Sequence, residues 1–358
     1  MKKITLIDYY GNCDASGRSI GHSPKVLTEY CSLIKDEYQV EAILPKCIAE
    51  EIDKTLFHAV KLLPYQIVEE GQRGIVKRII DKIKLFINIS QSLKKAEGDV
   101  VWFYRTDFFL FFYFCMHKKS QKHKICCLVY QQKFAEGNLG KLLDAIYRRG
   151  LQKFDGVIYT QKSAVPKHNY TFYMPDYYYD PDKYSKYQGI EKKFKAVCLG
   201  TMSPYKKLDE LVEAFNQNGI PLEIVGKFFT RDRANSLIQK AGRNIYIEDT
   251  ILTEEEYYSK LAEAQFVILP YDMKQYTGRT SGVLVEAMFV HTVPLAPWEL
   301  LEENGIVGIG YGDLKELENQ DVFGNGYGKA FMLLTEQCKG FPKKEETGKN
   351  IMQFIRGL

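Results

Sequence analysis

The 358-residue chain lacks a hydrophobic run long enough to cross a membrane and lacks any cysteine pattern typical of a metal site. Its longest apolar run, FFLFFYFCM over 108–116, is well short of the roughly 20 residues that a spanning helix needs. The eight cysteines include no CxxC pair and no histidine partner at metal-ligand spacing, and most lie in apolar stretches. We therefore expect a reducing, cytoplasmic setting and no structural metal.

The chain also lacks a strong charge bias and a signal peptide. Lys and Arg number 49 against 45 Asp and Glu, and this net charge of +4 is too weak to indicate a nucleic-acid partner. The N-terminal segment MKKITLIDYYG begins with two lysines, but its apolar run is too short for a signal sequence and is typical of a first strand. The length suits two domains of moderate size.

Strand-like runs alternate with helical stretches through the first half. We expect strands at 3–10, 39–45, 99–105, 124–131, 156–161 and 170–175, and helices near 24–37, 73–97, 108–119 and 138–153. This alternation is typical of a parallel sheet covered by helices.

The segment 176–193 is polar and tyrosine-rich, contains Pro181 and Gly189, and is interpreted as a linker or domain crossing. The alternation then resumes. We expect strands at 195–201, 221–226, 244–249 and 265–271, and helices at 206–217, 232–242 (ending at a glycine cap) and 253–264 (opening with a Thr253–Glu256 capping box).

This organisation predicts two α/β domains in tandem, 1–180 and 181–340, facing each other across a cleft. The remainder, 341–358, is expected to form a C-terminal helix and is a candidate to pack back on the first domain. Ligands of such domains bind outside the carboxyl ends of the parallel strands.

The stretch ILPYDMKQYTGRTSGVLVEAMFVHTVPLAP, 268–297, predicts a helix that begins at Ser281–Gly282 between two buried strands. The free N–H groups and the dipole of such a helix start favour an anion such as phosphate. Gly282 allows close approach, and Ser281 can cap the helix or bind an oxygen. Glu286, one turn further on, could accept hydrogen bonds from a ribose diol. Alternatively, Glu286 is exposed or pairs with Arg279, and the residues alone favour neither interpretation.

Four segments of the second half, together spanning about 195–300, resemble one family in order. They are VCLGTMSPYKKLDELVEAF, LEIVGK, the strand and helix of 244–264, and LPYDMKQYTGRTSGVLVEAMFVHTVPLAP. They resemble the donor domain of GT-B glycosyltransferases, closest to the retaining family 4 type (glycosyl transferases group 1). The resemblance implies the GT-B fold, in which two Rossmann-like domains face each other across a cleft. The first half resembles that family only in its architecture.

The chain departs from the family motif at three places, one of which is His291–Thr292, where the family has a small residue after its helix. The family has a pair of glutamates eight residues apart, and Gly278 stands where the first would precede Glu286. Thr201 replaces an arginine that follows the strand glycine, whereas the lysine after it matches Lys206, with Lys207 beside it. Because the missing glutamate contacts the donor sugar in the family, the choice of sugar and the activity itself remain open.

The resemblance implies a nucleotide-sugar site in the second domain. Lys206, Glu286 and Arg279 are the predicted catalytic residues. The predicted donor-binding residues are Gly200, Thr201, Lys206, Lys207, Gly226, Tyr276, Thr280, Ser281, Gly282, Val283 and Glu286. The implied donor is a UDP-, GDP- or dTDP-sugar, with no metal, and no DxD is placed at a strand end. The alternative for Lys206 is a solvated lysine at a helix start.

A glycine-rich loop follows the first strand, without the spacing of a dinucleotide-binding fingerprint. The predicted acceptor-side residues are Asp14, Gly17, Arg18, His22, Asp107 and Gln131, with Gln132 as an alternative to the last. For the loop residues, ordinary loop polarity is the competing and favoured interpretation.

The stretch 73–97 is predicted to be a basic helix with an apolar stripe. The stripe comprises Ile75, Val76, Ile79, Ile80, Ile83 and Phe86, and the flanking cations are Arg73, Lys77, Arg78, Lys82 and Lys84. Such a helix can lie on an anionic bilayer, although packing of the stripe on the sheet is the favoured alternative.

The predicted function is therefore a glycosyltransferase, a hexosyl- or related transferase. It would move a sugar to a glycan or lipid-linked acceptor in bacterial surface polysaccharide synthesis, in the cytoplasm or on the inner face of the membrane. One alternative is a non-catalytic GT-B-like protein that binds a nucleotide or glycan. Another is a different GT-B enzyme, such as a nucleotide-sugar epimerase.

Overall fold

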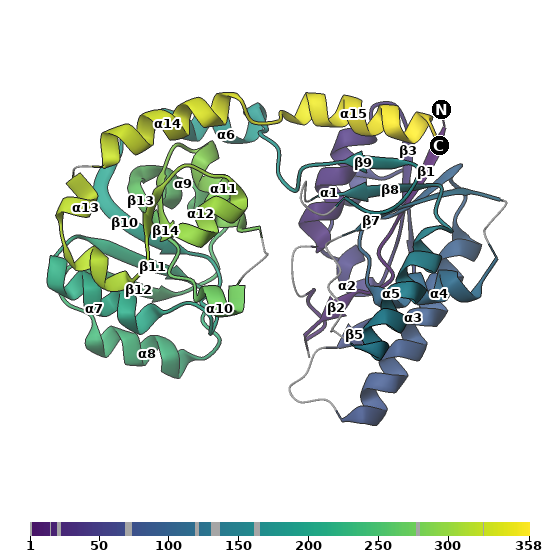
Figure 1. Ribbon diagram of the computed structural model, residues 1–358, viewed down its shortest axis with the longest axis horizontal. Coiled ribbons are helices and arrows are strands. Elements are labelled where there is room, and N and C mark those ends of the chain that lie inside the picture. The colour runs from purple at the N-terminus through teal and green to yellow at the C-terminus, as the bar shows by residue number, and fades with distance from the viewer. Residues whose placement is uncertain are drawn as a thin grey trace. The chain divides into compact units, whose positions relative to one another are not determined.

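The computed structural model describes residues 2–14, 16–19, 23–68, 74–118, 122–129, 137–160, 165–276, 280–324 and 326–358. The chain divides into two compact units. The first comprises Met1–Asp176 with Lys344–Leu358, and the second comprises Tyr177–Lys343. Each unit is a parallel sheet with helices packed on it (Figure 1).

The first unit is built on a seven-stranded sheet in the order β4-β3-β1-β6-β7-β8-β9. Its strands are β1 (Lys3–Ile7), β3 (Gln39–Leu44), β4 (Ala59–Leu62), β6 (Val100–Phe103), β7 (Lys124–Val129), β8 (Gly156–Tyr159) and β9 (Thr171–Tyr173). All six pairings are parallel, and the central strands are buried on both faces, which accounts for their continuous apolar runs. A small separate pair joins β2 (Asn12–Cys13) to β5 (Ile67–Val68).

The helices of the first unit agree with the predicted ones and add a short helix that the sequence pattern did not indicate. They are α1 (Ser23–Ile34), α2 (Lys46–Ala49), α3 (Ile75–Lys95), α4 (Phe108–Met116), α5 (Asn138–Leu151) and α15 (Lys344–Arg356). A one-turn 3₁₀ helix, η1, covers Lys54–Leu56. The terminal helix α15 packs on β9, where the rings of Tyr170 and Phe172 stack on Phe354 at centroid distances of 4.8 and 5.3 Å.

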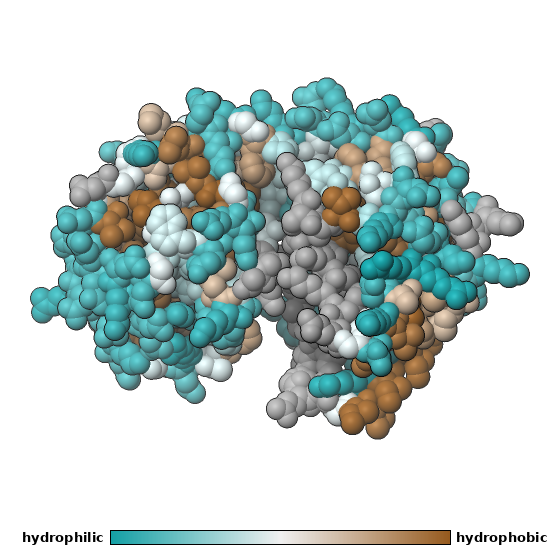
Figure 2. All heavy atoms as spheres, viewed as in Figure 1, coloured by the Kyte–Doolittle hydropathy of each residue, from teal (hydrophilic) through white to brown (hydrophobic). Residues whose placement is uncertain are grey.

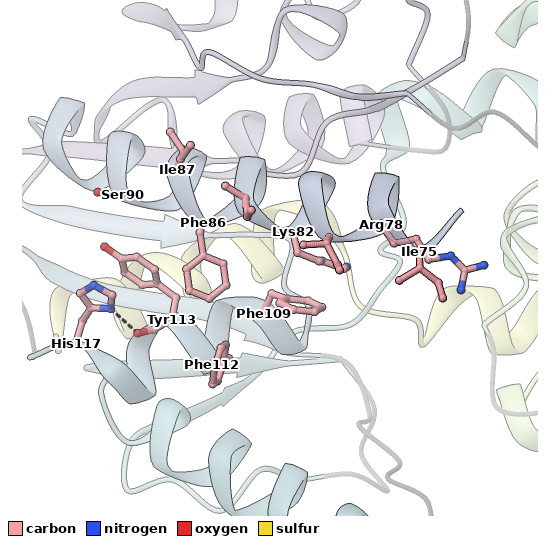
Figure 3. A pocket seen from close by; sticks show the side chains of 12 residues that line it. Ile75, Arg78, Lys82, Phe86, Ile87, Ser90, Phe109, Phe112, Tyr113 and His117 are labelled. Carbon is pink, nitrogen blue, oxygen red and sulfur yellow. Dashed lines mark hydrogen bonds between the residues drawn. The ribbon is translucent and has the colours of Figure 1, made fainter. Parts of the chain in front are cut away.

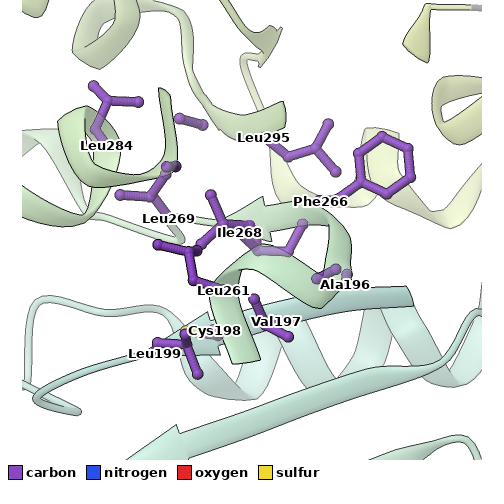
Figure 4. Packing of buried hydrophobic residues seen from close by; sticks show 14 of the residues in the cluster. Ala196, Val197, Cys198, Leu199, Leu261, Phe266, Ile268, Leu269, Leu284 and Leu295 are labelled. Carbon is purple, nitrogen blue, oxygen red and sulfur yellow. The ribbon is translucent and has the colours of Figure 1, made fainter. Parts of the chain in front are cut away.

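The second unit is built on a six-stranded sheet in the order β12-β11-β10-β13-β14-β15. Its strands are β10 (Lys193–Leu199), β11 (Leu222–Gly226), β12 (Ile245–Asp249), β13 (Ala264–Ile268), β14 (Val293–Pro297) and β15 (Ile309–Tyr311). Figure 4 shows the core, in which apolar side chains of β10, β13 and β14 meet those of the covering helices.

The helices of the second unit are more numerous than the sequence pattern indicated. They are α6 (Pro181–Gln188), α7 (Leu208–Asn218), α8 (Arg231–Lys240), α9 (Glu254–Glu263), α10 (Met273–Tyr276), α11 (Gly282–Phe289), α12 (Trp298–Asn304), α13 (Asp321–Gly324) and α14 (Tyr327–Lys339), with the 3₁₀ helix η2 at Leu314–Glu318. The capping box of α9 is confirmed: Thr253 accepts from the Glu256 N–H, and the Glu256 side chain accepts from the Thr253 N–H.

The segment 176–193, predicted to be a linker or domain crossing, does contain the division between the two units, at Asp176 and Tyr177, but it also contains helix α6. Asp180 caps this helix by accepting a hydrogen bond from the Asp182 N–H, and Pro181 occupies its first turn. Its buried face is made of Tyr184 and Tyr187, which give no aliphatic periodicity. The glycine cap predicted for the helix at 232–242 is wrong, since α8 ends at Ala241 in an extended conformation.

The preferred interpretation of the stripe on α3, that it packs on the sheet, is wrong for the first half of the helix. Ile75, Ile79 and Ile83 are 77, 56 and 55% exposed. Figure 2 shows the hydrophobic patch that they form with their neighbours at the lower right of the molecule, over α3. No described helix, α3 included, is both long and apolar enough to span a membrane.

All eight cysteines are free thiols. Seven of them are buried, and Cys115 is half-buried. They contribute to the apolar cores of both units, as their positions in apolar runs predicted.

The partly buried amine of Lys192 lies against the C-terminal end of α11, and we expect it to make the stability of the protein depend on pH. The Lys192 amine donates to the Val290 carbonyl at 2.9 Å and to the Thr292 hydroxyl at 2.8 Å, and burial lowers its pKa to about 7. Above that pH the unfolded chain binds the proton and the folded protein does not, so the free energy of unfolding rises with pH until the ordinary lysine pKa is reached. Between pH 7 and 9 we expect this residue to contribute a rise on the order of 1–2 kcal/mol.

Urea unfolding at several pH values measures this rise in wild type and in Lys192→Met, where it should disappear. The matched control is Lys193→Met, since Lys193 is exposed and pairs with Glu263 at 2.7 Å. An equal pH dependence in wild type and Lys192→Met would refute the assignment.

Candidate functional site

The order of strands gives each sheet one point at which the connections change direction. In the second unit the chain leaves β10 toward β11 and β12 and returns to β13 on the other side of β10. Ligands of parallel α/β sheets bind outside the carboxyl ends of the strands at such a switch point. The loop 200–207 follows β10, and 269–272 follows β13, so these segments form the candidate site in this unit.

Two glycines that were predicted to bind the donor shape this edge of the sheet. A Cβ built on Gly226, at the end of β11, would lie 1.7 Å from the carbonyl oxygen of Gly200, so no side chain fits there. Gly200 itself has a φ of +90°, a conformation that other residues rarely adopt. These glycines therefore determine the path of the loop that leads to Lys206, and Thr201 is exposed within it.

Lys206 is buried at the switch point, so the alternative of a solvated lysine is wrong. Its side chain is 7% exposed, and its amine donates to the Leu199 carbonyl at 3.0 Å. The amine also lies 3.9 Å from the Met202 sulfur and 5.8 Å from the centre of the Tyr271 ring. No carboxylate pairs with it in the part of the chain that the structure describes, which leaves a buried cation able to receive an anion.

Lys207 and Ser203 lie in the same loop as Lys206, and only Ser203 is buried as Lys206 is. Lys207 is exposed, and its amine lies 3.6 Å from the Glu210 carboxylate. Ser203 is 4% exposed, and its hydroxyl has no hydrogen-bond partner among the described residues. Such a buried hydroxyl usually has a partner, so Ser203, which the sequence analysis did not select, is a further candidate for ligand contact.

The predicted helix start at Ser281–Gly282 is confirmed as the start of α11. Ser281 is fully buried, and its hydroxyl accepts a hydrogen bond from the Leu284 N–H at 3.4 Å. The N–H groups of Gly282 and Val283 belong to the first turn and have no acceptor within the helix. A Cβ on Gly282 would lie 2.7 Å from the Tyr177 hydroxyl. In this structure, therefore, the group that comes close to the Gly282 backbone is the side chain of Tyr177.

Glu286 is 7% exposed, so the alternative of an exposed glutamate is wrong. Its carboxylate accepts hydrogen bonds from Tyr257 at 2.8 Å and from Tyr258 at 2.9 Å, both on α9. Burial, and then the negative charge of Glu286, raise the pKa of both tyrosines well above the ordinary value, so both remain protonated donors. The pair fixes the orientation of the carboxylate, and a carboxylate oxygen can accept a second hydrogen bond from a diol.

Tyr276 lies in an aromatic cluster rather than at the surface. Its ring centre is 4.1 Å from that of Tyr271 and 5.3 Å from that of Tyr205, and Tyr276 is 7% exposed. Burial raises the pKa of Tyr271 to about 12. Thr280 is half-buried, and Arg279 lies outside the described residues together with Gly278.

The loop after β1 in the first unit is held by the residues that were predicted to face the acceptor. The Asp14 carboxylate accepts from the Ser16 N–H at 2.9 Å and the Arg18 N–H at 3.0 Å, and hydrogen bonds from the Ser16 side chain and the Arg18 backbone lower its pKa. Gly17 has a φ of +85°, which the tight turn requires. These bonds agree with the favoured interpretation of the loop residues as ordinary loop structure. His22, a further predicted loop residue, lies outside the described part of the chain.

Asp107 caps α4. Its carboxylate accepts hydrogen bonds from the Tyr9 hydroxyl at 2.7 Å and from the Leu110 N–H at 3.1 Å. Gln131 and Gln132 lie outside the described residues.

A polar cluster that was not predicted from the sequence lies at the switch point of the first unit, between β1 and β6. Asp8 is fully buried and accepts hydrogen bonds from the Tyr10 N–H and the Tyr104 hydroxyl, each at 2.8 Å. Arg105 donates to the Ser23 hydroxyl at 3.0 Å and lies 4.7 Å from the centre of the Tyr10 ring. A signal was present, because Asp8 directly follows the buried strand β1 and Arg105 stands two residues after the end of the buried strand β6.

No group of three or more His, Cys, Asp or Glu side chains within the described ranges is placed to hold a metal ion.

No family model and no curated protein sequence matches the chain. Solved structures, in contrast, match it along its whole length. HepE of Anabaena, solved in complex with UDP, has a TM-score of 0.64 at 14% identity and covers 99% of this chain and 100% of its own. The glycosyltransferase AviGT4 of avilamycin A biosynthesis has a TM-score of 0.55 at 14% identity, covering 99 and 98%. MurG of Acinetobacter baumannii has a TM-score of 0.55 at 12% identity, and the match covers 100% of this chain and 100% of MurG. The fold is GT-B.

The GT-B fold confirms the predicted fold class, two Rossmann-like α/β units with parallel sheets. The strand order places Lys206, Ser203 and the start of α11 at the carboxyl edge of the second sheet, and Asp8 and Arg105 at the carboxyl edge of the first, the edge at which parallel α/β sheets generally bind ligands. At these levels of identity the likeness is one of fold.

Proposed function

We propose that the chain is a glycosyltransferase that takes a sugar from a nucleoside diphosphate sugar bound to its second unit. The observation that carries the proposal is the buried amine of Lys206, which has no carboxylate partner among the described residues and lies at the switch point between β10 and β13. A buried charge without a counter-ion is costly to stability, so a bound anion is a reason to retain it. The structure of HepE with UDP supports a nucleotide as that anion.

Each part of the proposed donor site has a role. The Lys206 amine, the Arg279 guanidinium and the first N–H groups of α11 stabilise the diphosphate as charge builds up on the leaving group. Glu286 accepts hydrogen bonds from the ribose hydroxyls. The donor is a UDP-, GDP- or dTDP-sugar, and the transfer retains the configuration at the anomeric carbon without a metal. Gly200, Gly226 and Ser203 shape and complete the loop beside the phosphates.

The acceptor is proposed to bind to the first unit, at the polar cluster that follows β1 and β6. Asp8 and Arg105 lie at this edge, with Asp107 at the start of α4. We propose a glycan or lipid-linked acceptor, in the synthesis of a bacterial surface polysaccharide on the inner face of the membrane. This finer assignment is supported by the resemblance of residues 195–300 to family 4 glycosyltransferases, a family with members in polysaccharide synthesis.

A second candidate function is a GT-B-like protein that binds a nucleotide or glycan without turnover. It is favoured by one observation, the glycine at position 278 where the similar family has the first of two glutamates. Hydrolysis of a donor in the absence of acceptor would argue against it.

A nucleotide screen tests the donor site. Among UDP, GDP, CMP and dTDP we expect one diphosphate family to raise the melting temperature by about 5–10 °C at 100 times its dissociation constant, since that excess stabilises by about 2.7 kcal/mol. Glu286→Gln should lower the affinity for the same nucleotide by about 10- to 150-fold, because a hydrogen bond to a charged group contributes about 1.5–3 kcal/mol. Titration calorimetry below the melting temperature measures both constants.

The control for the screen is the corresponding nucleoside, which lacks the diphosphate and should bind far more weakly. Absence of any shift would contradict the donor site, and an affinity within about twofold of wild type in Glu286→Gln would contradict the ribose contact.

A further inference from the structure

An apolar groove runs between α3 and α4 in the first unit, with a volume of about 750 Å³. Figure 3 shows Phe86 of α3 and Phe109 and Phe112 of α4 along it. Its charged lining side chains are Arg78 and Lys82, both from α3. The Lys82 amine lies 3.9 Å from the centre of the Phe109 ring. Neither cation has an ion-pair partner among the described residues.

The groove opens beside an exposed apolar face. The exposed apolar residues on the first three turns of α3 are Ile75 (77%), Val76 (71%), Ile79 (56%), Ile80 (46%) and Ile83 (55%). The basic residues of the same turns are Lys77, Arg78, Lys82 and Lys84, of which Lys84 lies 3.8 Å from the Asp81 carboxylate. The one acid in α3, Asp81, is 6% exposed. This surface therefore combines apolar area with positive charge.

The topology places this surface at the ligand-binding edge of the sheet. Helices between parallel strands run back along the sheet, so α3, α4 and α5 begin at the carboxyl ends of the strands. Leu139 and Leu142, in the first turns of α5, are also exposed, at 70 and 57%. The Lys82 amine lies 5.9 Å from the centre of the Tyr10 ring, and the Arg105 guanidinium lies 4.7 Å from the same ring centre. The groove therefore adjoins the polar cluster that follows β1 and β6.

We propose that this surface docks on an anionic lipid bilayer, with an acyl chain of a phospholipid in the α3–α4 groove and its phosphate at Arg78 and Lys82. An amphipathic helix with a basic rim binds such a surface through both apolar burial and charge. The basic residues beside the apolar face, among them Arg78 and Lys82, which have no ion-pair partner in the described ranges, add attraction to anionic headgroups, which favours an anionic lipid as the occupant. The inference builds on the proposed lipid-linked acceptor, but its test requires no donor, so the two can fail separately.

Sedimentation with vesicles tests the docking. The full-length protein should bind vesicles made of phosphatidylcholine with about 30 mol% phosphatidylglycerol. It should bind vesicles of pure phosphatidylcholine far more weakly. Arg78→Glu with Lys82→Glu should lower the partition coefficient by about 25-fold or more, since each basic residue at the surface strengthens binding by about fivefold. Ile79→Glu with Ile83→Glu should lower it by roughly tenfold or more.

Matched controls carry the same chemical changes elsewhere. Ile238→Glu alters a side chain that is 50% exposed on α8, and Lys329→Glu reverses an exposed charge on α14. Both should bind as wild type does. No binding by wild type, or equal binding by the α3 variants, would overturn the proposal. Loss of a dimer in Ile79→Glu with Ile83→Glu, without vesicle binding by wild type, would assign the face to self-association instead and would also overturn it.

A fluorescent probe tests the groove itself. Ile83→Trp should show a blue-shifted emission on phosphatidylglycerol vesicles and should be quenched by lipids brominated on the acyl chain. The native tryptophans, Trp102 and Trp298, supply the background that wild type measures. Quenching no greater than in wild type would show that no chain enters the groove.

Discussion

Lys206→Met is expected to weaken nucleoside diphosphate binding by about 10- to 150-fold and to leave the folded protein at least as stable as wild type. The loss of affinity follows from removal of a charged hydrogen bond to the diphosphate, worth about 1.5–3 kcal/mol. The preserved stability follows from the environment of the amine, which contacts the Leu199 carbonyl, the Met202 sulfur and the Tyr271 ring. Removal of a buried charge without a counter-ion relieves its desolvation cost. Titration calorimetry and urea unfolding measure the two quantities.

The combination of these two results distinguishes a ligand-binding lysine from a structural one. Lys207→Met is the matched control, because Lys207 is the adjacent lysine, is exposed and pairs with Glu210. It should change affinity by less than about threefold, as exposed ion pairs contribute little. If Lys206→Met bound the nucleotide as wild type does but unfolded more easily, Lys206 would be a structural residue and the donor-site assignment would be wrong.

Gly226→Ala is expected to destabilise the protein by about 3 kcal/mol or more, at the upper end of overpacking effects. The added Cβ would lie 1.7 Å from the Gly200 carbonyl oxygen, so backbone rather than a mobile side chain would have to move. Because that backbone leads into the loop of Lys206, nucleotide affinity should fall as well. Urea unfolding and calorimetry on the same samples measure both effects.

The control for this substitution is Gly189→Ala. A Cβ at Gly189 meets nothing within 4 Å, and the residue lies at the end of α6 in the same unit. It should change the free energy of unfolding by less than about 1 kcal/mol. Equal stability of the two variants would show that the contact between Gly226 and Gly200 relaxes easily.

The strands and most long helices could be predicted because each carries a local pattern. The buried strands of a parallel sheet are continuous apolar runs, and α9 opens with a capping box made of side chains three residues apart. The start of α11 followed from Ser281 and Gly282 in the same way. Helix α6 could not be predicted, because its buried face consists of Tyr184 and Tyr187 in a polar segment.

The environment of the candidate site depends on contacts between residues far apart in sequence. The Lys206 amine lies 5.8 Å from the ring centre of Tyr271, which follows another strand, and the Glu286 carboxylate is held by Tyr257 and Tyr258 from a different helix. For α3, a helical apolar stripe predicts amphipathicity but not whether a partner surface covers it, and in this structure its first half remains exposed.

The burial of the thiols makes this chain suited to site-specific labelling. Burial raises the pKa of Cys31 and Cys47 to about 12 and that of Cys338 to about 11, so at pH 7 roughly one molecule in 10⁴ to 10⁵ carries a thiolate at each of these positions. The other buried cysteines lie in the same kind of apolar surroundings. A single cysteine introduced on the exposed face of α3 should therefore react with a maleimide dye well ahead of the seven buried native ones, and those seven should resist oxidation in air.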